Sequence, residues 1–193
     1  MKKAAFLDRD GVINRKAPEG QYVTCWEEMV FLPEAQEAVR LLNHAGFFVV
    51  VVSNQRCIAK GLITTAELDS LHSRLRSEFA LADARLDAIF YCPHENEPPC
   101  GCRKPQPGLL LDAGRRHDID LETSWMIGDS WRDVEAGRRA GCRTVRVIDQ
   151  DESAIGNADL IASSLLDAVH KILEVEAGPR PLISVSREGL TTW

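Results

Sequence analysis

The chain has 193 residues and a formal net charge of −6, with 45% hydrophobic and 27% charged residues. This length is sufficient for one domain with a substantial core, and the composition is ordinary for a globular protein. The acidic balance disfavours a nucleic-acid partner. No apolar run approaches the roughly 20 residues of a membrane span, and the N-terminus does not resemble a signal peptide. We therefore expect a cytoplasmic protein, monomeric by default, with no nucleic-acid or membrane partner.

The first apolar run, residues 4–7, predicts a short buried strand. It ends at two carboxylates, Asp8 and Asp10, which one residue separates. In open α/β sheets the carboxyl ends of the strands border the ligand site. Two acids this close repel each other, which favours a divalent cation with oxygen ligands. One carboxylate could then act as a nucleophile and the other as a proton donor or acceptor. Two solvated acids at a strand end are the plainer alternative.

Strands and helices are predicted to alternate along the rest of the chain. Apolar runs predict further strands at 47–52, 86–91, 125–127, 144–148 and 155–161. Apolar stripes predict helices at 33–46, 65–79 with Thr65 as N-cap, 108–116, 134–140 and 165–175. This alternation is typical of an α/β fold with a central parallel sheet and helices on both faces. The polar stretch 15–28 predicts a loop that folds over the site.

A single domain is predicted over residues 1–177, because no repeat and no second hydrophobic unit is found. Residues 178–193 contain two prolines and scattered polar side chains, which predicts a C-terminal tail.

A proline-rich loop at 92–107 has no apolar periodicity, so something other than a core must order it. It contains four soft metal ligands, namely Cys92, His94, Cys100 and Cys102. Their close spacing fits a closed tetrahedral site for a structural Zn²⁺, with no position left for a catalytic water. Three free thiols beside an unconnected histidine are the alternative.

Polar side chains follow the other predicted strands as well. They are Ser53, Asn54, Gln55, Arg103, Lys104, Asp129 and Asp133. The carboxyl ends of parallel strands meet at one edge of a sheet, so we expect these side chains to lie together. Taken singly, Lys104 could be a solvated loop lysine and Ser53 could merely end its strand. Asp133 could complement a helix dipole, or it could support the site as a neighbour of Asp129.

In this order, Asp-Arg-Asp-Gly, Ser-Asn-Gln, Arg-Lys-Pro and Gly-Asp-Ser-x-x-Asp resemble the motifs of the haloacid dehalogenase (HAD) superfamily, from about residue 4 to 147. The resemblance implies a Rossmann-like three-layer sandwich with no large cap domain and with the zinc-binding loop as an insertion. It also implies a Mg²⁺-dependent phosphatase that acts through an aspartyl-phosphate. Phosphoryl transfer needs an in-line nucleophile and positive charge near the phosphoryl oxygens, and the residue types agree with that.

The resemblance assigns a role to each matched residue. Asp8 would attack phosphorus, and Asp10 would act as general acid and then general base. Ser53 and Lys104 would bind the transferring phosphoryl group. The Mg²⁺ ligands would be Asp8, Asp129 and the backbone carbonyl of Asp10.

With the Cys-Pro-His and Cys-x-Cys loop included, the motifs look like two related families. The Pro-x-Pro-Gly after Lys104 favours the D-glycero-D-manno-heptose-1,7-bisphosphate 7-phosphatases, which implies a small phosphorylated sugar on the way to nucleotide-activated heptose. The short spacing between His94 and Cys100 is closer to the histidinol-phosphate phosphatases. A DNA 3′-phosphatase is disfavoured by the acidic charge. Arg56 and Cys57 depart from the family, and Arg56 either adds a phosphate contact or points away.

By the same resemblance, Asn54, Gln55 and Arg103 bind the substrate. Arg103 lies between a zinc ligand and the catalytic lysine, and a guanidinium there can hold a phosphate in a forked geometry. The alternative is a surface arginine paired with Glu95 or Glu97.

Overall fold

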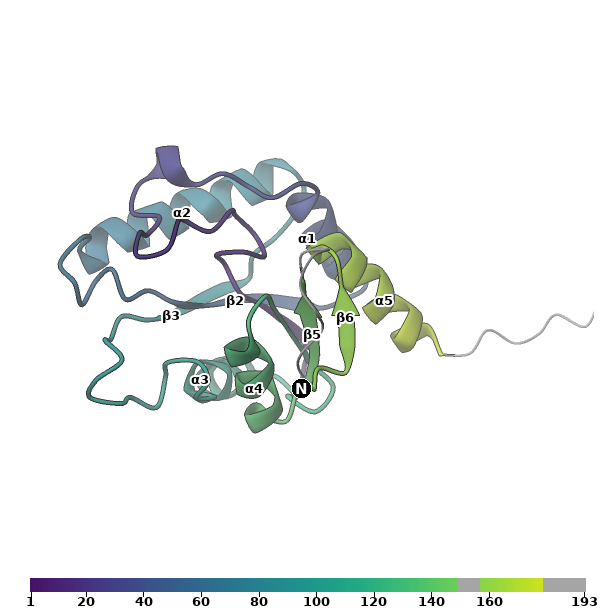
Figure 1. Cartoon of the computed structure of the whole chain (residues 1–193). Coiled ribbons are helices and arrows are strands. Elements are labelled where there is room, and N and C mark those ends of the chain that lie inside the picture. Colours follow the sequence, from purple (N-terminus) through teal and green to yellow (C-terminus); the bar gives the residue numbers. More distant parts are fainter. Residues whose placement is uncertain (149–156, 179–193) are drawn as a thin grey trace, which may run out of the picture.

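The computed structural model describes residues 1–148 and 157–178, which form an α/β sandwich around one parallel sheet (Figure 1). The sheet has six strands in the order β3-β2-β1-β4-β5-β6. The strands are β1 Ala4–Leu7, β2 Phe48–Asn54, β3 Ala88–Cys92, β4 Trp125–Gly128, β5 Arg143–Val147 and β6 Leu160–Ala162. The predicted fold class, an α/β sandwich with a central parallel sheet and no large cap domain, is confirmed.

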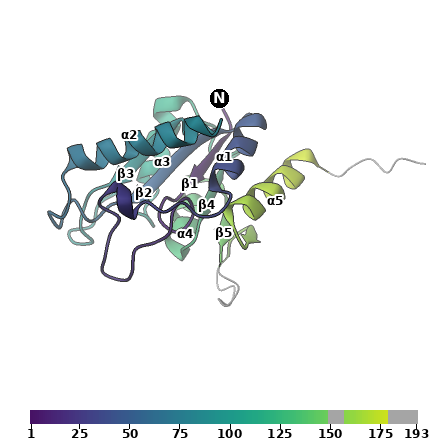
Figure 2. The ribbon, with the colours of Figure 1, turned by 90° about the horizontal axis from the view of Figure 1, so that it is seen from above.

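Helices cover both faces of this sheet, as two views of the ribbon show (Figure 1, Figure 2). On one face lie α1 (Ala35–His44), α2 (Thr65–Leu81) and α5 (Leu165–Ala177), and on the other α3 (Gly108–His117) and α4 (Trp131–Ala140). Parallel strands need crossover connections, and α1 to α4 supply them between the first five strands. None of the helices in the described part of the chain has the length and apolar character needed to cross a bilayer.

β1 lies at the centre of the sheet because its four residues are apolar and fully buried. Successive side chains of a strand point to opposite faces. Ala5 and Leu7 therefore pack in the core under α1 and α5, whereas Ala4 and Phe6 pack under α3 and α4. A strand that is covered on both faces is apolar throughout, which is why the sequence identified this one.

The register of the sheet gathers the polar strand ends at one edge. Leu7, the last residue of β1, lies opposite Ile127 in β4. Asp8 and Asp129, which follow β1 and β4, therefore lie at the same edge of the sheet. Ser53 lies near the end of the neighbouring strand β2. The carboxyl edge of the three central strands is thus where the predicted site residues meet.

The loop 15–28 contains a short 3₁₀ helix, Trp26–Glu28, and packs on α2. Val23 and Met29 form a small apolar cluster with Leu71 of α2. This cluster fixes the loop beside the carboxyl edge of the sheet.

Two predicted helix starts are wrong by one to three residues. The N-cap of α2 is Thr64 and not Thr65, since its hydroxyl accepts from Glu67 N at 3.2 Å and Glu67 closes a capping box. α4 begins at Trp131 instead of residue 134, because Ser130 and the third residue after it form another capping box. Adjacent threonines and serines look alike in sequence, and only the backbone geometry selects the cap.

Other boundaries shift as well. α1 begins at Ala35, after Pro33 and a left-handed residue. β6 covers Leu160–Ala162 in place of 155–161, and residues 155–156 lie outside the described residues. Residues 179–193 of the expected tail also lie outside them.

Gly137 brings α4 directly against the sheet. A Cβ at this position would lie 2.7 Å from Met126 Cβ and 2.8 Å from Thr144 Cγ2, on two buried strands. We expect Gly137→Ala to lower the free energy of unfolding by about 1–3 kcal/mol in urea denaturation, because the helix must move outward.

The matched control is Gly114→Ala in α3, where the nearest atom to a Cβ would be a Leu121 methyl at 3.4 Å. We expect this variant to be as stable as the parent or slightly more stable, since alanine is the better helix former. Equal losses from the two substitutions would contradict the close approach of α4.

Candidate active site

The chain turns sharply after β1. The N–H groups of Ile13 and Asn14 donate to Arg9 O at 2.8 and 3.1 Å. Gly11 has φ +98°, a conformation that favours glycine, and a Cβ there would collide with the Asp129 carboxylate. The turn thereby holds both acids of the Asp-x-Asp pattern at the sheet edge.

Lys104 is the buried cation of the site. Only 2% of its side chain is exposed, and its Nζ lies 2.8 Å from Asp8 Oδ1 and 2.6 Å from Asp133 Oδ1. Nζ also donates to Val52 O at 2.7 Å. These acceptors match the three donors of an ammonium group. The interpretation of Lys104 as a solvated loop residue is therefore wrong.

The charges around Lys104 shift the pKa values of their neighbours. Burial raises the pKa of Asp8 to about 7; Lys104 opposes this shift, while Asp133 and Asp129 add to it. Burial alone would lower the pKa of Lys104, but the charges of Asp133 and Asp8 raise it. Lys104 therefore stays charged, and ionised Asp8 is favoured by any further positive charge nearby.

Asp133 combines the two roles that the sequence left open. Its Oδ2 accepts from Ser130 N at 3.0 Å and from Ser130 Oγ at 2.6 Å, which caps α4. Its Oδ1 pairs with Lys104, and the side chain is 1% exposed. Both oxygens are thus engaged within the protein, so Asp133 supports the lysine.

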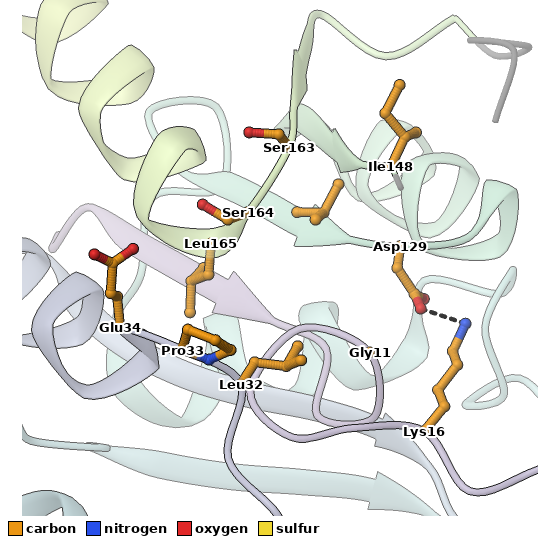
Figure 3. Close-up of a pocket in the computed structure, with 11 residues that line it drawn as sticks. Gly11, Lys16, Leu32, Pro33, Glu34, Asp129, Ile148, Ser163, Ser164 and Leu165 are labelled. Carbon is orange, nitrogen blue, oxygen red and sulfur yellow. Dashed lines mark ion pairs between the residues drawn. The ribbon is translucent and has the colours of Figure 1, made fainter. Parts of the chain in front are cut away.

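Asp129 follows β4 and faces the turn after β1. One of its oxygens, Oδ2, forms an ion pair with Lys16 from the loop 15–28 (Figure 3). The other, Oδ1, is buried and has no hydrogen-bond partner among the residues that the structure describes. Burial raises the pKa of Asp129. Sequence analysis did not identify Lys16, because nothing in its irregular loop indicates which way it points.

Asp129 and Lys16 also border a cavity of about 520 Å³ that is separate from the remaining site residues. Figure 3 shows the residues that line it. Its other walls come mainly from the chain before α1 and from the start of α5, with apolar side chains such as Leu32 and Leu165.

Asp10 lies in a different environment from Asp8. Its Oδ1 accepts from Asn14 Nδ2 at 2.8 Å and from Arg9 Nε at 3.2 Å, and its Oδ2 accepts from Gln55 Nε2 at 3.0 Å. Burial would raise the pKa of Asp10, but the Arg9 charge and these hydrogen bonds hold it below its ordinary value. Two carboxylates two residues apart are thus pushed in opposite directions: the pKa of Asp8 is raised and that of Asp10 is lowered, so Asp10 ionises more readily than Asp8 unless further positive charge lies beside Asp8.

The three polar residues at the end of β2 support their neighbours. The Asn54 amide accepts from Lys104 N at 3.0 Å and donates to Lys104 O at 3.1 Å, so it clamps the lysine backbone. Gln55 Nε2 donates to Ser53 Oγ at 2.7 Å as well as to Asp10. Gln55 is buried, and both amides are occupied by protein groups. Ser53 and Asn54 both line the site cavity, and the Ser53 hydroxyl still has its own proton to donate.

Arg9 and His72 are functional candidates that sequence analysis missed. Arg9 is fully buried and His72 is 4% exposed, and Arg9 Nη1 lies 3.1 Å from His72 Nε2. A usable signal existed, since His72 falls on the apolar stripe of α2 beside Leu68, Leu71 and Leu75.

The carboxyl edge of the sheet borders a cavity of about 190 Å³. Asp8, Asp10 and Lys104 line its floor, and two guanidinium groups, of Arg103 and Arg132, also border it. Sequence analysis did not identify Arg132. A small anionic substrate would meet positive charge at this opening.

Arg103 is held by the loop 92–107. Its Nε donates to Asn96 Oδ1 at 2.8 Å and its Nη1 donates to His94 O at 3.3 Å. Among the described residues no ion pair joins Arg103 to Glu95 or Glu97, and Glu95 pairs with Arg56 at 3.3 Å. Arg56 thus ties the loop after β2 to the loop 92–107.

The four predicted zinc ligands converge. Cys92 Sγ lies 3.5 Å from Cys100 Sγ, 3.2 Å from Cys102 Sγ and 3.5 Å from His94 Nδ1. Zinc–ligand bonds of about 2.0–2.3 Å in a tetrahedron require ligand separations of about 3.5–3.8 Å. Although burial opposes it, hydrogen bonds from the Arg103 backbone and the other thiols lower the pKa of Cys100 to about 7. Burial raises the pKa values of Cys92 and Cys102, so the fit to a zinc ion rests on the donor set and on its convergence.

A second set of oxygen ligands fits a hard cation. Ligand atoms of Asp8, Asp129 and Asp133 lie within 4.8 Å of one another. Within the described residues, the hydrogen bond from Arg9 N and the ion pair with Lys104 both use Oδ1 of Asp8, and Asp129 Oδ1 has no hydrogen-bond partner there. Three acids face one buried lysine, so the arrangement fits Mg²⁺ between Asp8 and Asp129.

Comparison with known proteins supports this chemistry. A HAD-hydrolase-like family model matches residues 101–168. The chain is 40% identical to D-glycero-beta-D-manno-heptose-1,7-bisphosphate 7-phosphatase of Pseudomonas aeruginosa over 74% of this chain and 79% of that protein. It is 36% identical to the D-glycero-alpha-D-manno-heptose-1,7-bisphosphate 7-phosphatase of Mycobacterium tuberculosis, over 79% of this chain and 83% of that protein.

A solved structure agrees over most of the fold. The D,D-heptose 1,7-bisphosphate phosphatase of Bordetella bronchiseptica, complexed with magnesium and phosphate, superposes with a TM-score of 0.80 and 34% identity. The match covers 89% of this chain and 98% of that one. The chain therefore belongs to the family of HAD-like phosphatases that includes the heptose-1,7-bisphosphate 7-phosphatases.

Proposed function

We propose that the chain is a Mg²⁺-dependent phosphatase that removes the 7-phosphate from a D-glycero-D-manno-heptose 1,7-bisphosphate. The observation that carries the reaction type is the buried Lys104 ammonium, 2.8 Å from Asp8, beside a second carboxylate with separate partners. The observation that carries the substrate is the family membership, because the relatives named above act on this sugar. Relatives of both anomeric specificities are similar to the chain, so the proposal covers either anomer.

In the first step an Asp8 carboxylate oxygen attacks phosphorus in line with the sugar oxygen. The bond from phosphorus to that oxygen breaks, and an aspartyl-phosphate forms on Asp8. Lys104 and the Ser53 hydroxyl donate to the phosphoryl oxygens, where negative charge is concentrated. Asp10, which must carry a proton when the substrate is bound, gives it to the departing sugar oxygen, which leaves as an alcohol.

In the second step water attacks the aspartyl-phosphate. Asp10, now ionised, takes a proton from that water, and phosphate leaves as the Asp8 carboxylate is regenerated. The hydrogen bonds from Asn14 and Gln55 keep Asp10 directed into the site through both steps.

Magnesium would be held by Asp8, Asp129 and the backbone carbonyl of Asp10. The bound ion would supply positive charge that offsets the repulsion between carboxylate and phosphate. Lys16, which pairs with Asp129 and is 54% exposed, is free to move into solvent when the ion binds.

Zinc would be held by Cys92, His94, Cys100 and Cys102. Its role would be structural, to order the loop 92–107. The loop it closes carries both Arg103 and Lys104, so ordering this loop places two cationic groups at the cavity. We further propose that the protein acts as a cytoplasmic monomer, and that residues 1–177 form its one domain.

Replacing the proposed nucleophile tests the mechanism. Asp8→Asn should reduce kcat below about one thousandth of the parent value, about 4 kcal/mol of barrier, because an amide is no nucleophile. The protein should remain folded, as judged by circular dichroism. Asp118→Asn, an exposed acid in a left-handed turn that asparagine also accepts, is the matched control and should keep full activity. Turnover by Asp8→Asn above that limit would rule out covalent catalysis at Asp8.

Metal analysis tests the division of labour between the two metals. We expect one zinc per chain in protein purified without chelator, and a separate requirement for added Mg²⁺. Cys102→Ser should lose zinc and unfold at a lower temperature, whereas Cys142→Ser, a buried cysteine outside the cluster, should keep zinc. A preparation without zinc, or activity restored to chelated enzyme by zinc alone, would contradict the assignment.

A substitution at Arg103 tests whether the substrate is a bisphosphate. Arg103→Ala should raise KM for a heptose 1,7-bisphosphate ten-fold or more, roughly 1.4 kcal/mol, because a forked contact to the second phosphate is lost. It should scarcely change the hydrolysis of p-nitrophenyl phosphate, which has no second group. Arg85→Ala, an exposed arginine paired with Asp87, is the control and should change neither.

The same assay on the parent enzyme compares heptose bisphosphate with histidinol phosphate, fructose bisphosphate and a 3′-phosphorylated oligonucleotide. The highest kcat/KM on any compound other than the heptose would overturn the substrate assignment. Equal losses of Arg103→Ala on both substrates would mean that this arginine supports the reacting centre.

A further inference from the structure

The guanidinium of Arg9 is enclosed between the Asp-x-Asp turn and α2. Its Nη2 lies 3.0 Å from Asp10 Oδ1 and 2.9 Å from Asp10 Oδ2, and its Nε lies 3.2 Å from Oδ1. Its remaining nitrogen, Nη1, lies 3.1 Å from His72 Nε2. Arginine is rarely buried completely unless its donors are paired. Asp10 and His72 together fix this side chain.

His72 must act as an acceptor in this contact. A guanidinium only donates, so Nε2 needs a lone pair and the ring proton belongs on Nδ1. Burial and the Arg9 charge lower the pKa of His72 to about 3, although Asp10 opposes the shift, which keeps the ring neutral. The Tyr91 ring packs against it at 5.4 Å between centroids.

The position of His72 is costly for a residue with only a packing role. Its Nδ1 is buried and has no hydrogen-bond partner among the described residues. A buried polar group without a partner destabilises the fold, and an apolar side chain would fit the stripe of α2 without that cost. The contact with Arg9 is what distinguishes histidine from leucine or phenylalanine here.

We propose that His72 is a positioning residue for proton transfer: it fixes Arg9, and Arg9 holds the Asp10 carboxylate in the orientation that protonates the leaving oxygen. This inference rests on the proposed role of Asp10 as the general acid. The two Asp10 oxygens already have distinct partners, Asn14 on Oδ1 and Gln55 on Oδ2. The guanidinium bridges both oxygens, so its tilt sets the tilt of the carboxylate plane.

The proposal predicts a dependence on the leaving group. A nitrophenolate leaves readily without a proton, whereas a sugar alkoxide or a p-methoxyphenolate is more basic and needs one. Loss of Asp10 alignment must therefore slow substrates with basic leaving groups most. A residue that only stabilises the fold would slow all substrates alike.

The experiment compares His72→Phe, which keeps a ring but has no acceptor, with His72→Gln, whose amide oxygen can accept from Arg9. kcat/KM is measured for p-nitrophenyl, phenyl and p-methoxyphenyl phosphate and for the heptose bisphosphate. We expect His72→Phe to lose ten-fold or more on p-methoxyphenyl phosphate and on the sugar, and less than three-fold on p-nitrophenyl phosphate. His72→Gln should stay within three-fold of the parent on every substrate.

His117→Phe is the matched control, because His117 lies on the other face of the sheet against the Phe48 and Phe90 rings. It should leave the dependence on the leaving group unchanged. Equal losses of His72→Phe on all substrates, or no loss on any, would overturn the proposal. If the parent does not hydrolyse the heptose bisphosphate, the proposed substrate is wrong, and the aryl series still decides the role of His72.

A measurement on the parent protein covers the case in which His72→Phe does not fold. The ¹H–¹⁵N spectrum of the imidazole should show the proton of His72 on Nδ1 and a bare Nε2 at neutral pH. A proton on Nε2, or a charged ring, would exclude the acceptor role and with it the proposal.

Discussion

The buried ion pairs of Lys104 are the interaction on which the rest of the site depends. A fully desolvated ammonium is tolerated only with complete pairing, and the structure supplies Asp8, Asp133 and the Val52 carbonyl. Each of these acceptors comes from a different element, namely the end of β1, the first turn of α4 and the end of β2. Removing any of them would leave a buried charge incompletely paired. The lysine therefore connects the ends of β1 and β2 to the first turn of α4.

This dependence gives the loop 92–107 its importance. Lys104 belongs to a loop with little hydrophobic core of its own, and two sets of contacts fix its position. The Asn54 amide clamps its backbone from β2, and the cluster of Cys92, His94, Cys100 and Cys102 closes the loop just before it. A metal that orders a loop can thus control a catalytic charge without touching the substrate. The Arg56–Glu95 pair adds a further connection between this loop and the loop after β2.

The two acids of the Asp-x-Asp turn show how neighbouring residues acquire different chemistry. Asp8 faces other carboxylates and burial raises its pKa to about 7, whereas Asp10 faces a buried guanidinium and has a lowered pKa. The turn that separates them depends on Gly11, whose backbone conformation and lack of Cβ allow the Asp129 carboxylate to approach. One residue between the acids is enough to direct them to separate partners.

The sequence by itself determined the α/β fold class, the polar strand ends and the four soft ligands, because apolar periodicity and ligand spacing are local properties. The contacts of Asp133 with Ser130 and Lys104, the choice of Thr64 over Thr65 as the cap of α2, and the partners of Arg103 were decided only by the tertiary structure. The same holds for Lys16, Arg132 and the Arg9–His72 contact, which joins residues 63 positions apart. Such contacts depend on how a loop or helix face is oriented once the whole sheet is assembled, and no local pattern encodes that orientation.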